Sequence, residues 1–226
     1  MNSTSMSSLH TDGSLTFRIA GAMPATPRRL LLLSHGVGGN ETNLGALLER
    51  AADDTLVVLP RAPLDMGMRQ YAWFQVAFDP QGPRPNLVAA EQSRQRLATF
   101  IAELQGQYGV PPSKTVAAGF SQGGIMSASI GLTRPDLVRG FGVLAGRILP
   151  EIQPLLADRN ALARIEAFIG HGWDDTKLTV DWAHRADAWL SELGIPHQTR
   201  LYPGDHGLPP SMLDDFFAWF ERLTQS

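Results

Sequence analysis

The feature that most restricts the possible folds of this chain is a series of short, continuously apolar runs. Stretches with helical spacing separate these runs. Residues 30–34 (LLLLS) and 55–60 (TLVVLP) are rich in leucine and valine and show no alternation of polar and apolar residues. Such runs are typical of parallel strands that are buried on both faces. Residues 41–52, between them, carry leucines at helical spacing. This order predicts an α/β fold with a doubly wound, mostly parallel sheet and helices on both faces.

The rest of the chain continues the alternation. We predict further strands over 14–20, 114–120, 139–146, 164–172 and 197–204, and helices over 87–108, 122–132, 180–194 and 210–223. Residues 61–86 contain several prolines and large apolar groups, so we expect an irregular segment with a functional role. Because no repeat or linker divides the chain, we expect a flexible tail over 1–13 and a single domain over 14–226.

Composition excludes several classes of protein. The formal net charge is −3 and no run of lysine and arginine occurs, which argues against nucleic-acid binding. The absence of cysteine excludes disulfides, thiolate metal sites and a cysteine nucleophile. The polar N-terminus lacks a signal-peptide pattern, and no apolar run approaches the ~18 residues that a membrane span needs. We therefore expect a cytoplasmic protein without stable membrane insertion; a homodimer remains open.

Four predicted strands are followed by glycine together with polar or ionisable residues. These segments are HGVGG, GFSQGG, HGWDD and GDHG, which begin at residues 35, 119, 171 and 204. In open α/β sheets, ligands bind beyond the carboxyl ends of the strands. We therefore expect the functional site at this edge of the sheet.

GFSQGG carries the most specific chemistry of the four. Ser121 stands between small residues where a predicted strand gives way to a predicted helix, which is the G-x-S-x-G pattern of a nucleophile turn. A serine hydroxyl needs a neighbouring base and donors for the developing oxyanion. The same pattern also occurs by chance as a surface turn, but the strand before it and the helix after it favour a nucleophile.

The order of residues along the chain predicts the partners of Ser121. A nucleophile turn of this kind is followed by an acid and then by a histidine, each after a later strand. Only His206 lies in a glycine-containing loop between the last strand and the last helix. Asp174 and Asp175 both follow the strand over 164–172, and the residues alone leave the choice between them open.

Several segments of the chain resemble the phospholipase/carboxylesterase family of α/β-hydrolases, which includes the acyl-protein thioesterases. The resemblance covers roughly residues 15–222 and rests on HGVGGNETNL, LPRAP, YAWF, GFSQGG, HGWDD and YPGDHG. It implies an α/β-hydrolase fold and a small-molecule acyl ester as substrate, with thioesters and lysophospholipids as further candidates. It also implies that Asp175 is the acid and His206 the base.

The resemblance and the chemistry together imply a Ser-His-Asp triad and an acyl-enzyme. The backbone N–H groups of Val37 and Gln122 would form the oxyanion hole. No metal or organic cofactor is expected, since the sequence has neither an HExxH nor a P-loop pattern.

Candidates for an acyl pocket come from the irregular segment: Trp73, Phe74, Phe78, Met66 and Met68. An ordinary core under a long loop would use the same residue types. Trp173 and Leu208 flank the expected acid and base, so we also expect them to contact substrate.

Two alternatives remain at this stage. One is a non-catalytic ligand-binding homologue on the same fold, although all three triad positions are filled. The other is an acyltransferase or lactonase that uses the same site, because a fold does not fix a reaction. A serine-directed fluorophosphonate probe would identify the first, and product analysis with water and alcohol acceptors would identify the second.

Overall fold

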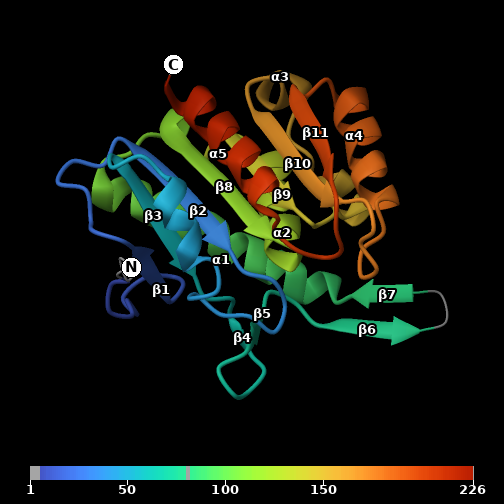
Figure 1. Ribbon diagram of the computed structural model, residues 1–226, viewed down its shortest axis with the longest axis horizontal. Helices are drawn as coiled ribbons and strands as arrows, with labels where there is room; N and C mark the ends of the chain where they lie inside the picture. Colours follow the sequence, from blue (N-terminus) through green and yellow to red (C-terminus); the bar gives the residue numbers. More distant parts are fainter. Residues whose placement is uncertain (1–5, 80–81, 226) are drawn as a thin grey trace.

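A seven-stranded sheet forms the centre of the molecule (Figure 1). The computed structural model describes residues 6–79 and 82–225. The strand order is β1-β3-β2-β8-β9-β10-β11, and only the edge strand β1 runs antiparallel to its neighbour. The predicted mostly parallel, doubly wound sheet is therefore confirmed. The strands are β1 (Phe17–Ala20), β2 (Arg29–Ser34), β3 (Thr55–Pro60), β8 (Thr115–Phe120), β9 (Gly140–Leu144), β10 (Glu166–Gly172) and β11 (His197–Tyr202).

Both faces of the sheet are buried, as the apolar runs predict. In β2, Leu30 and Leu32 pack into one core cluster, whereas Leu31 and Leu33 pack into the other. This alternation follows from the two-residue period of a strand. Figure 1 shows α5 in front of the sheet and α1 behind it. The first cluster lies under α1 (Leu87–Tyr108), α2 (Gln122–Thr133) and α4 (Asp181–Leu193), and the second under η1 (Gly45–Arg50) and α5 (Pro210–Gln225).

The ends of the long helices follow from local side-chain chemistry. Asn86 caps α1, because its side chain accepts a hydrogen bond from the N–H of Ala89 at 3.0 Å. The same helix ends at Gly109, and α4 ends at Gly194, both in the left-handed conformation that glycine adopts without strain. The predicted bounds of α1 are confirmed. Three shorter helices complete the fold: η2 (Pro112–Lys114), η3 (Pro150–Leu155) and α3 (Arg159–Leu162).

Two stretches differ from the prediction. Residues 61–86 are not irregular throughout, because they form two hairpins: β4 (Leu64–Asp65) with β5 (Tyr71–Ala72), and β6 (Val76–Asp79) with β7 (Gly82–Pro85). Figure 1 shows the β4–β5 hairpin projecting below the sheet and the β6–β7 hairpin extending to the lower right. The helix predicted over 41–52 is also wrong, since only the short 3₁₀ helix η1 forms there. The Asn40 side chain accepts hydrogen bonds from the N–H and hydroxyl of Thr42, and such local bonds compete with a helix.

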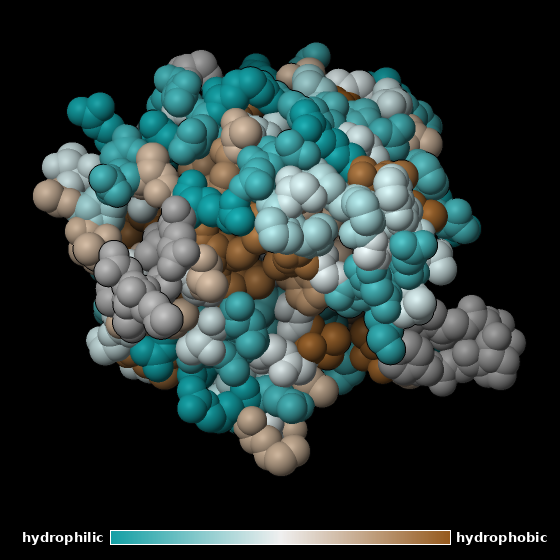
Figure 2. Space-filling view, viewed as in Figure 1, coloured by the Kyte–Doolittle hydropathy of each residue, from teal (hydrophilic) through white to brown (hydrophobic). Residues whose placement is uncertain are grey.

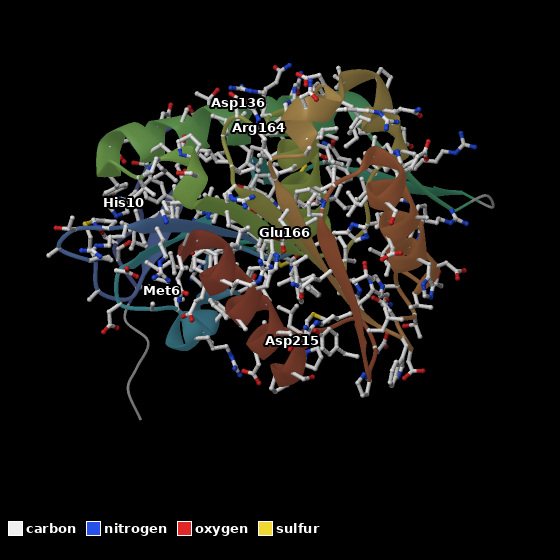
Figure 3. All side chains as sticks on the ribbon, turned by 90° about the horizontal axis from the view of Figure 1, so that it is seen from above. Met6, His10, Asp136, Arg164, Glu166 and Asp215 are labelled. Carbon is white, nitrogen blue, oxygen red and sulfur yellow. The ribbon has the colours of Figure 1, made fainter. Side chains whose placement is uncertain are left out.

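The segment before β1 pairs with that strand. The N–H of Ser7 donates to the carbonyl of Ile19 at 2.9 Å, and the His10 ring stacks on Phe17 at 4.7 Å. Figure 3 shows His10 and Met6 beside β1, on the side of the molecule away from α4. Residues 6–13 are thus attached to the sheet edge. The predicted division into a flexible tail over 1–13 and a domain over 14–226 stays a prediction.

Candidate active site

The loops after β8, β10 and β11 bring the three predicted reactive residues together. The arrowheads of β2, β8 and β10 point to the same side of the molecule (Figure 1). These strands are parallel to their neighbours, so the segments that follow them meet at one edge of the sheet. The edge contains Ser121 after β8, Asp175 after β10 and His206 after β11.

Ser121 occupies a strained turn between β8 and α2. Its φ and ψ angles are 54° and −115°, a combination that L-residues rarely adopt. Small neighbours make the turn possible. A Cβ at Gly119 would lie 2.5 Å from the carbonyl carbon of Gly123, and one at Gly123 would collide with the backbone of Ser34. The glycines of G-x-S-x-G therefore let the nucleophile turn pass close to β2.

The side chain of Ser121 does not cap the helix that follows it. Serine at an N-cap usually accepts a backbone hydrogen bond, but this hydroxyl makes no capping bond. It instead lies 3.0 Å from Nε2 of His206. Nδ1 of the same ring donates to Oδ2 of Asp175 at 2.7 Å. The three side chains thus form one hydrogen-bonded chain from a hydroxyl through an imidazole to a carboxylate.

Asp175 is buried, and its carboxylate is surrounded by several hydrogen-bond donors. Its exposed fraction is 4%. Oδ1 accepts hydrogen bonds from the N–H groups of Lys177 and Leu178, each at 2.8 Å. Nε2 of the buried His171 lies 3.2 Å from Oδ2 and 2.7 Å from the carbonyl oxygen of Leu178. Because a carbonyl only accepts, Nε2 of His171 carries a proton and adds a further donor near the carboxylate.

The neighbouring acids have different roles. Asp174 is exposed and contacts the next loop through its backbone, since its N–H donates to the carbonyl of Gly204 at 3.2 Å. Asp205 accepts hydrogen bonds from the N–H of Thr176 and of His206, both at 2.7 Å. The bond from the Thr176 N–H is the main reason that the pKa of Asp205 is lowered. Asp205 therefore ties the histidine loop to the aspartate loop.

The HGVGG segment after β2 forms another wall of the site. His35 is buried, and burial lowers its pKa. Its Nδ1 donates to the carbonyl of Gly36 at 2.7 Å, while Nε2 accepts from the N–H of Ala62 at 3.1 Å. The N–H of Val37 makes no hydrogen bond to any residue within 6–79 or 82–225. The N–H of Gln122 lies in the first turn of α2, where no intrahelical acceptor exists.

A cavity of about 330 Å³ opens beside Ser121. Most of its walls are apolar, and Figure 2 shows hydrophobic surface at the centre of the displayed face and again beside the β6–β7 hairpin. The lining residues are Gly36, Val37, Phe74, Val76, Phe120, Ser121, Gln122, Ile125, Arg147, Lys177, Leu178 and His206. The cavity thus joins the hydroxyl, the imidazole and the two expected oxyanion donors to an apolar wall.

The irregular segment contributes less to this cavity than expected. Phe74 lines it, but Trp73 is buried beneath, where its Nε1 donates to the carbonyl of His35 at 2.9 Å. Met66 and Met68 do not line it: Met68 is 91% exposed, because both methionines lie at the β4–β5 hairpin. The side chain of Phe78 lies outside the described part of the chain.

The residues beside the acid and the base also lie outside this lining. Trp173 is 52% exposed and borders none of the cavity. Leu208 lines a neighbouring depression of about 450 Å³ together with Val37 and Phe120. Within residues 6–79 and 82–225, no group of three or more histidine and acidic side chains is placed to hold a metal ion.

Three polar residues at the site were missed by sequence reasoning: His171, Arg147 and Lys177. His171 lies in the HGWDD motif, but the pattern indicates only its place beside a glycine at a strand end. Arg147 follows β9, and the rule that ligands bind beyond strand ends would have pointed to it. Lys177 follows the acid in a segment without a distinctive motif.

Comparison with known proteins identifies the family. The phospholipase/carboxylesterase family model matches residues 20–222. The chain belongs to the phospholipase/carboxylesterase family. Members similar to it include acyl-protein thioesterase 1 of Gibberella zeae, which is 25% identical over 92% of this chain and 94% of its own. Acyl-protein thioesterase 1 of Kluyveromyces lactis is 29% identical over 76% of this chain and 79% of its own.

Solved structures agree with the family assignment. The crystal structure of esterase PE8 superposes with a TM-score of 0.78 at 26% identity, covering 89% of this chain and 95% of that one. A carboxylesterase from Mesorhizobium loti has a TM-score of 0.79 at 24% identity, over 94% and 97% of the two chains, which supports the fold. The chain is thus a hydrolase of the α/β-hydrolase fold, as the sequence motifs predict.

Proposed function

We propose that this chain hydrolyses carboxylic esters or thioesters through an acyl-enzyme on Ser121. In this proposal His206 is the base, and Asp175 is the carboxylate of the triad. The observation that carries the proposal is the hydrogen-bonded chain from Ser121 through His206 to Asp175, with distances of 3.0 and 2.7 Å. Such an arrangement lets an imidazole remove the hydroxyl proton as the oxygen attacks. Ser121 and His206 both line the cavity.

Acylation begins when Oγ of Ser121 attacks the carbonyl carbon of the substrate. Nε2 of His206 takes the hydroxyl proton, and Asp175 stabilises the resulting imidazolium. Collapse of the tetrahedral intermediate breaks the bond to the leaving group, which receives the proton from His206. Water then attacks the acyl-enzyme with His206 again as base, which releases the acid and restores Ser121.

Backbone donors stabilise the tetrahedral oxyanion in this scheme. Within residues 6–79 and 82–225, no group accepts a hydrogen bond from the N–H of Gln122 or of Val37, so both can donate to the oxyanion. The N-terminus of α2 adds a favourable dipole. Loss of one such donor typically costs about 10²–10³ in kcat. The Gln122 side chain also positions its own segment, because Oε1 accepts from the N–H of Trp73 and Nε2 donates to the carbonyl of Phe74, each at 2.8 Å.

The apolar wall of the cavity and the names of the relatives support an acyl substrate. Phe74, Val76 and Ile125 offer an apolar surface next to Ser121. The related proteins include acyl-protein thioesterases, and similar solved structures include an esterase and a carboxylesterase. Both ester and thioester carbonyls suit a serine nucleophile, so the chemistry of the site accommodates either leaving group.

Turnover of a short p-nitrophenyl ester by wild type and by Ser121→Ala tests the proposal. The variant should lose turnover while its circular dichroism and melting temperature stay those of wild type. A fluorophosphonate probe should label wild type at Ser121 and leave the variant unlabelled. Retained turnover in the variant, or a folded wild type without labelling, would contradict the proposal and favour a binding protein.

No helix within residues 6–79 or 82–225 combines the length and the apolar character that a bilayer crossing demands. The cytoplasmic location and the homodimer stay predictions. Size-exclusion chromatography with light scattering would test the second, since a dimer doubles the mass of 24.6 kDa.

A further inference from the structure

Arg147 is a buried cation that the proposed mechanism does not use. It follows β9 at the carboxyl edge of the sheet, three residues after the last residue of that strand. Its exposed fraction is 7%, and it belongs to the lining of the cavity that contains Ser121 and His206. A guanidinium is always charged in proteins and carries five N–H donors, so a buried one normally has a carboxylate or carbonyl partner.

No such partner is present for Arg147 within the described ranges 6–79 and 82–225. Its guanidinium forms neither a hydrogen bond nor an ion pair with any residue there. None of its nitrogens is among the fully buried polar atoms without a partner, so the donors keep contact with accessible space. Burial lowers the pKa of Arg147, and Glu151, the acid whose charge acts on it, offsets this only in part.

An aromatic ring fixes the orientation of this cation. The guanidinium carbon lies 4.4 Å from the centre of the Trp182 ring, near the start of α4. This contact stabilises the face of the guanidinium and leaves its N–H edge free to bind a planar anion. Arg185 contacts the same ring at 4.8 Å, but it is exposed and lines a separate depression.

The lining of the cavity is unbalanced in charge. Arg147 and Lys177 are both part of it, whereas none of its lining residues within the described part of the chain is an aspartate or a glutamate. Asp175 lies behind the imidazole of His206 and is already engaged by four donors. A cavity that combines cationic side chains with apolar walls favours a ligand that is apolar in one part and anionic in another.

We propose that Arg147 binds an anionic group, a carboxylate or a phosphate, on the ester or thioester that Ser121 attacks. This subsite deepens the proposed function and depends on it. Arg147 would hold the anion by charge-assisted, two-point hydrogen bonds while Lys177 adds positive charge at the exposed side. The substrate class is thus an acyl ester or thioester with a negative charge within reach of the scissile carbonyl.

The anion could belong to either half of the substrate, and two matched pairs of esters distinguish the halves. Mono-p-nitrophenyl adipate and p-nitrophenyl hexanoate have acyl chains of equal carbon number, and only the first carries a terminal carboxylate. 1-Hexanoylglycerol 3-phosphate and 1-hexanoylglycerol share the acyl chain, and only the first carries a charge on the alcohol. The measured quantity is the ratio of kcat/KM for the charged ester to kcat/KM for its neutral partner.

Arg147→Met should lower this ratio by about 10-fold to 100-fold in one pair, because a charge-assisted hydrogen bond is lost. The pair that responds locates the anion on the acyl chain or on the alcohol. Arg147→Lys keeps the charge without the planar fork, so its ratio should fall between those of wild type and Arg147→Met. It also provides a second variant if Arg147→Met does not fold. Arg185→Met is the matched control and should leave both ratios unchanged.

The subsite is overturned if neither ratio falls by more than about twofold in Arg147→Met, or if Arg185→Met lowers a ratio equally. Ser121→Ala separates this failure from failure of the proposed function. If Ser121→Ala is inactive on all four esters while both ratios are the same in Arg147→Met as in wild type, only the subsite is wrong. If Ser121→Ala retains turnover, the proposed function itself is wrong.

Discussion

The loops after β8, β10 and β11 differ from the two hairpins over residues 61–86 in how their side chains are held. Ser121 and Asp175 are buried, and backbone geometry or several donors fix each of them. The side chains of Met66 and Met68, in the β4–β5 hairpin, are instead exposed. The sheet edge therefore fixes the reacting groups, whereas the tip of the β4–β5 hairpin holds exposed side chains that do not line the cavity.

The two regions are nevertheless joined at specific points. The Gln122 side chain bonds to the backbone of Trp73 and Phe74, and so connects the start of α2 to the hairpin segment. A second joint connects the hairpin segment to the segment after β2, because Glu41 there accepts hydrogen bonds from Arg61 at 2.7 and 2.8 Å. Substitutions in the loops, at these joints and at the hairpin tip should therefore have graded effects.

The largest effect is expected for His206→Ala. Loss of the base should lower kcat for a p-nitrophenyl ester by about 10⁴–10⁶-fold, because the hydroxyl of Ser121 is no longer deprotonated during attack. Steady-state kinetics measure the loss, and unchanged circular dichroism shows that the fold persists. A loss below about tenfold would mean that the reacting groups do not lie at this edge.

The next largest effect distinguishes the two adjacent acids. Asp175→Asn should lower kcat by about 10⁴-fold, because the amide no longer holds the imidazole in the required tautomer. Asp174→Asn should change kcat by less than about threefold, since this exposed side chain is not part of the hydrogen-bonded chain. Equal losses of kcat in the two variants would contradict the assignment of Asp175, rather than Asp174, as the partner of His206.

Gln122→Ala tests the first joint between the two regions. It leaves the buried N–H of Trp73 without its acceptor, which costs about 1–3 kcal/mol of unfolding free energy. The backbone donor of residue 122 remains, so kcat/KM should fall far less than in His206→Ala. Urea unfolding and ester kinetics on the same sample provide the two values. An unchanged unfolding free energy would argue against the joint.

Glu41→Gln tests the second joint through its pH dependence. Hydrogen bonds from Arg61 lower the pKa of Glu41 from its ordinary value of 4.5 to about 2. A lowered pKa in the folded state stabilises the protein above pH 4.5, and this stabilisation is lost as the pH falls toward 2. Wild type should thus exceed the variant in unfolding free energy at pH 7, and the difference should shrink below pH 4.5. A difference that stays constant from pH 7 to pH 3 would contradict the ion pair.

The smallest effect is expected at the hairpin tip. Met68→Ser should change kcat/KM for short p-nitrophenyl esters by less than about twofold, because the side chain is 91% exposed and does not line the cavity. Ile125→Ser, in the cavity wall, is the contrasting variant and should raise KM for longer acyl chains. A larger effect at Met68 than at Ile125 would mean that the hairpin tip contacts the substrate more than this part of the cavity wall does.

The parts of the fold that a local sequence pattern determines were predicted correctly. Local causes explain the apolar runs of β2 and β3, the bounds of α1 and the turn at Ser121. The hairpins over 61–86 were missed, because strands of two to four residues carry too little alternation to register as a pattern.

The rest of the candidate site depends on contacts between distant segments. The free donors of Arg147 follow from the absence of an acceptor among the described residues that pack around it, which no local pattern reveals. The donor contact of His171 with Asp175 depends on the fold of the loop between them. The exposure of Met68 likewise depends on a hairpin that was not expected.

Trapping of the acyl-enzyme would show whether Ser121 is the nucleophile. Rapid acid quenching during turnover of a slowly hydrolysed p-nitrophenyl ester, followed by intact-mass and peptide analysis, should give a protein heavier by one acyl group. The added mass should lie on the peptide that contains Ser121 and should be absent from Ser121→Ala. Turnover by wild type without any acyl adduct, or an adduct on another residue, would contradict the account.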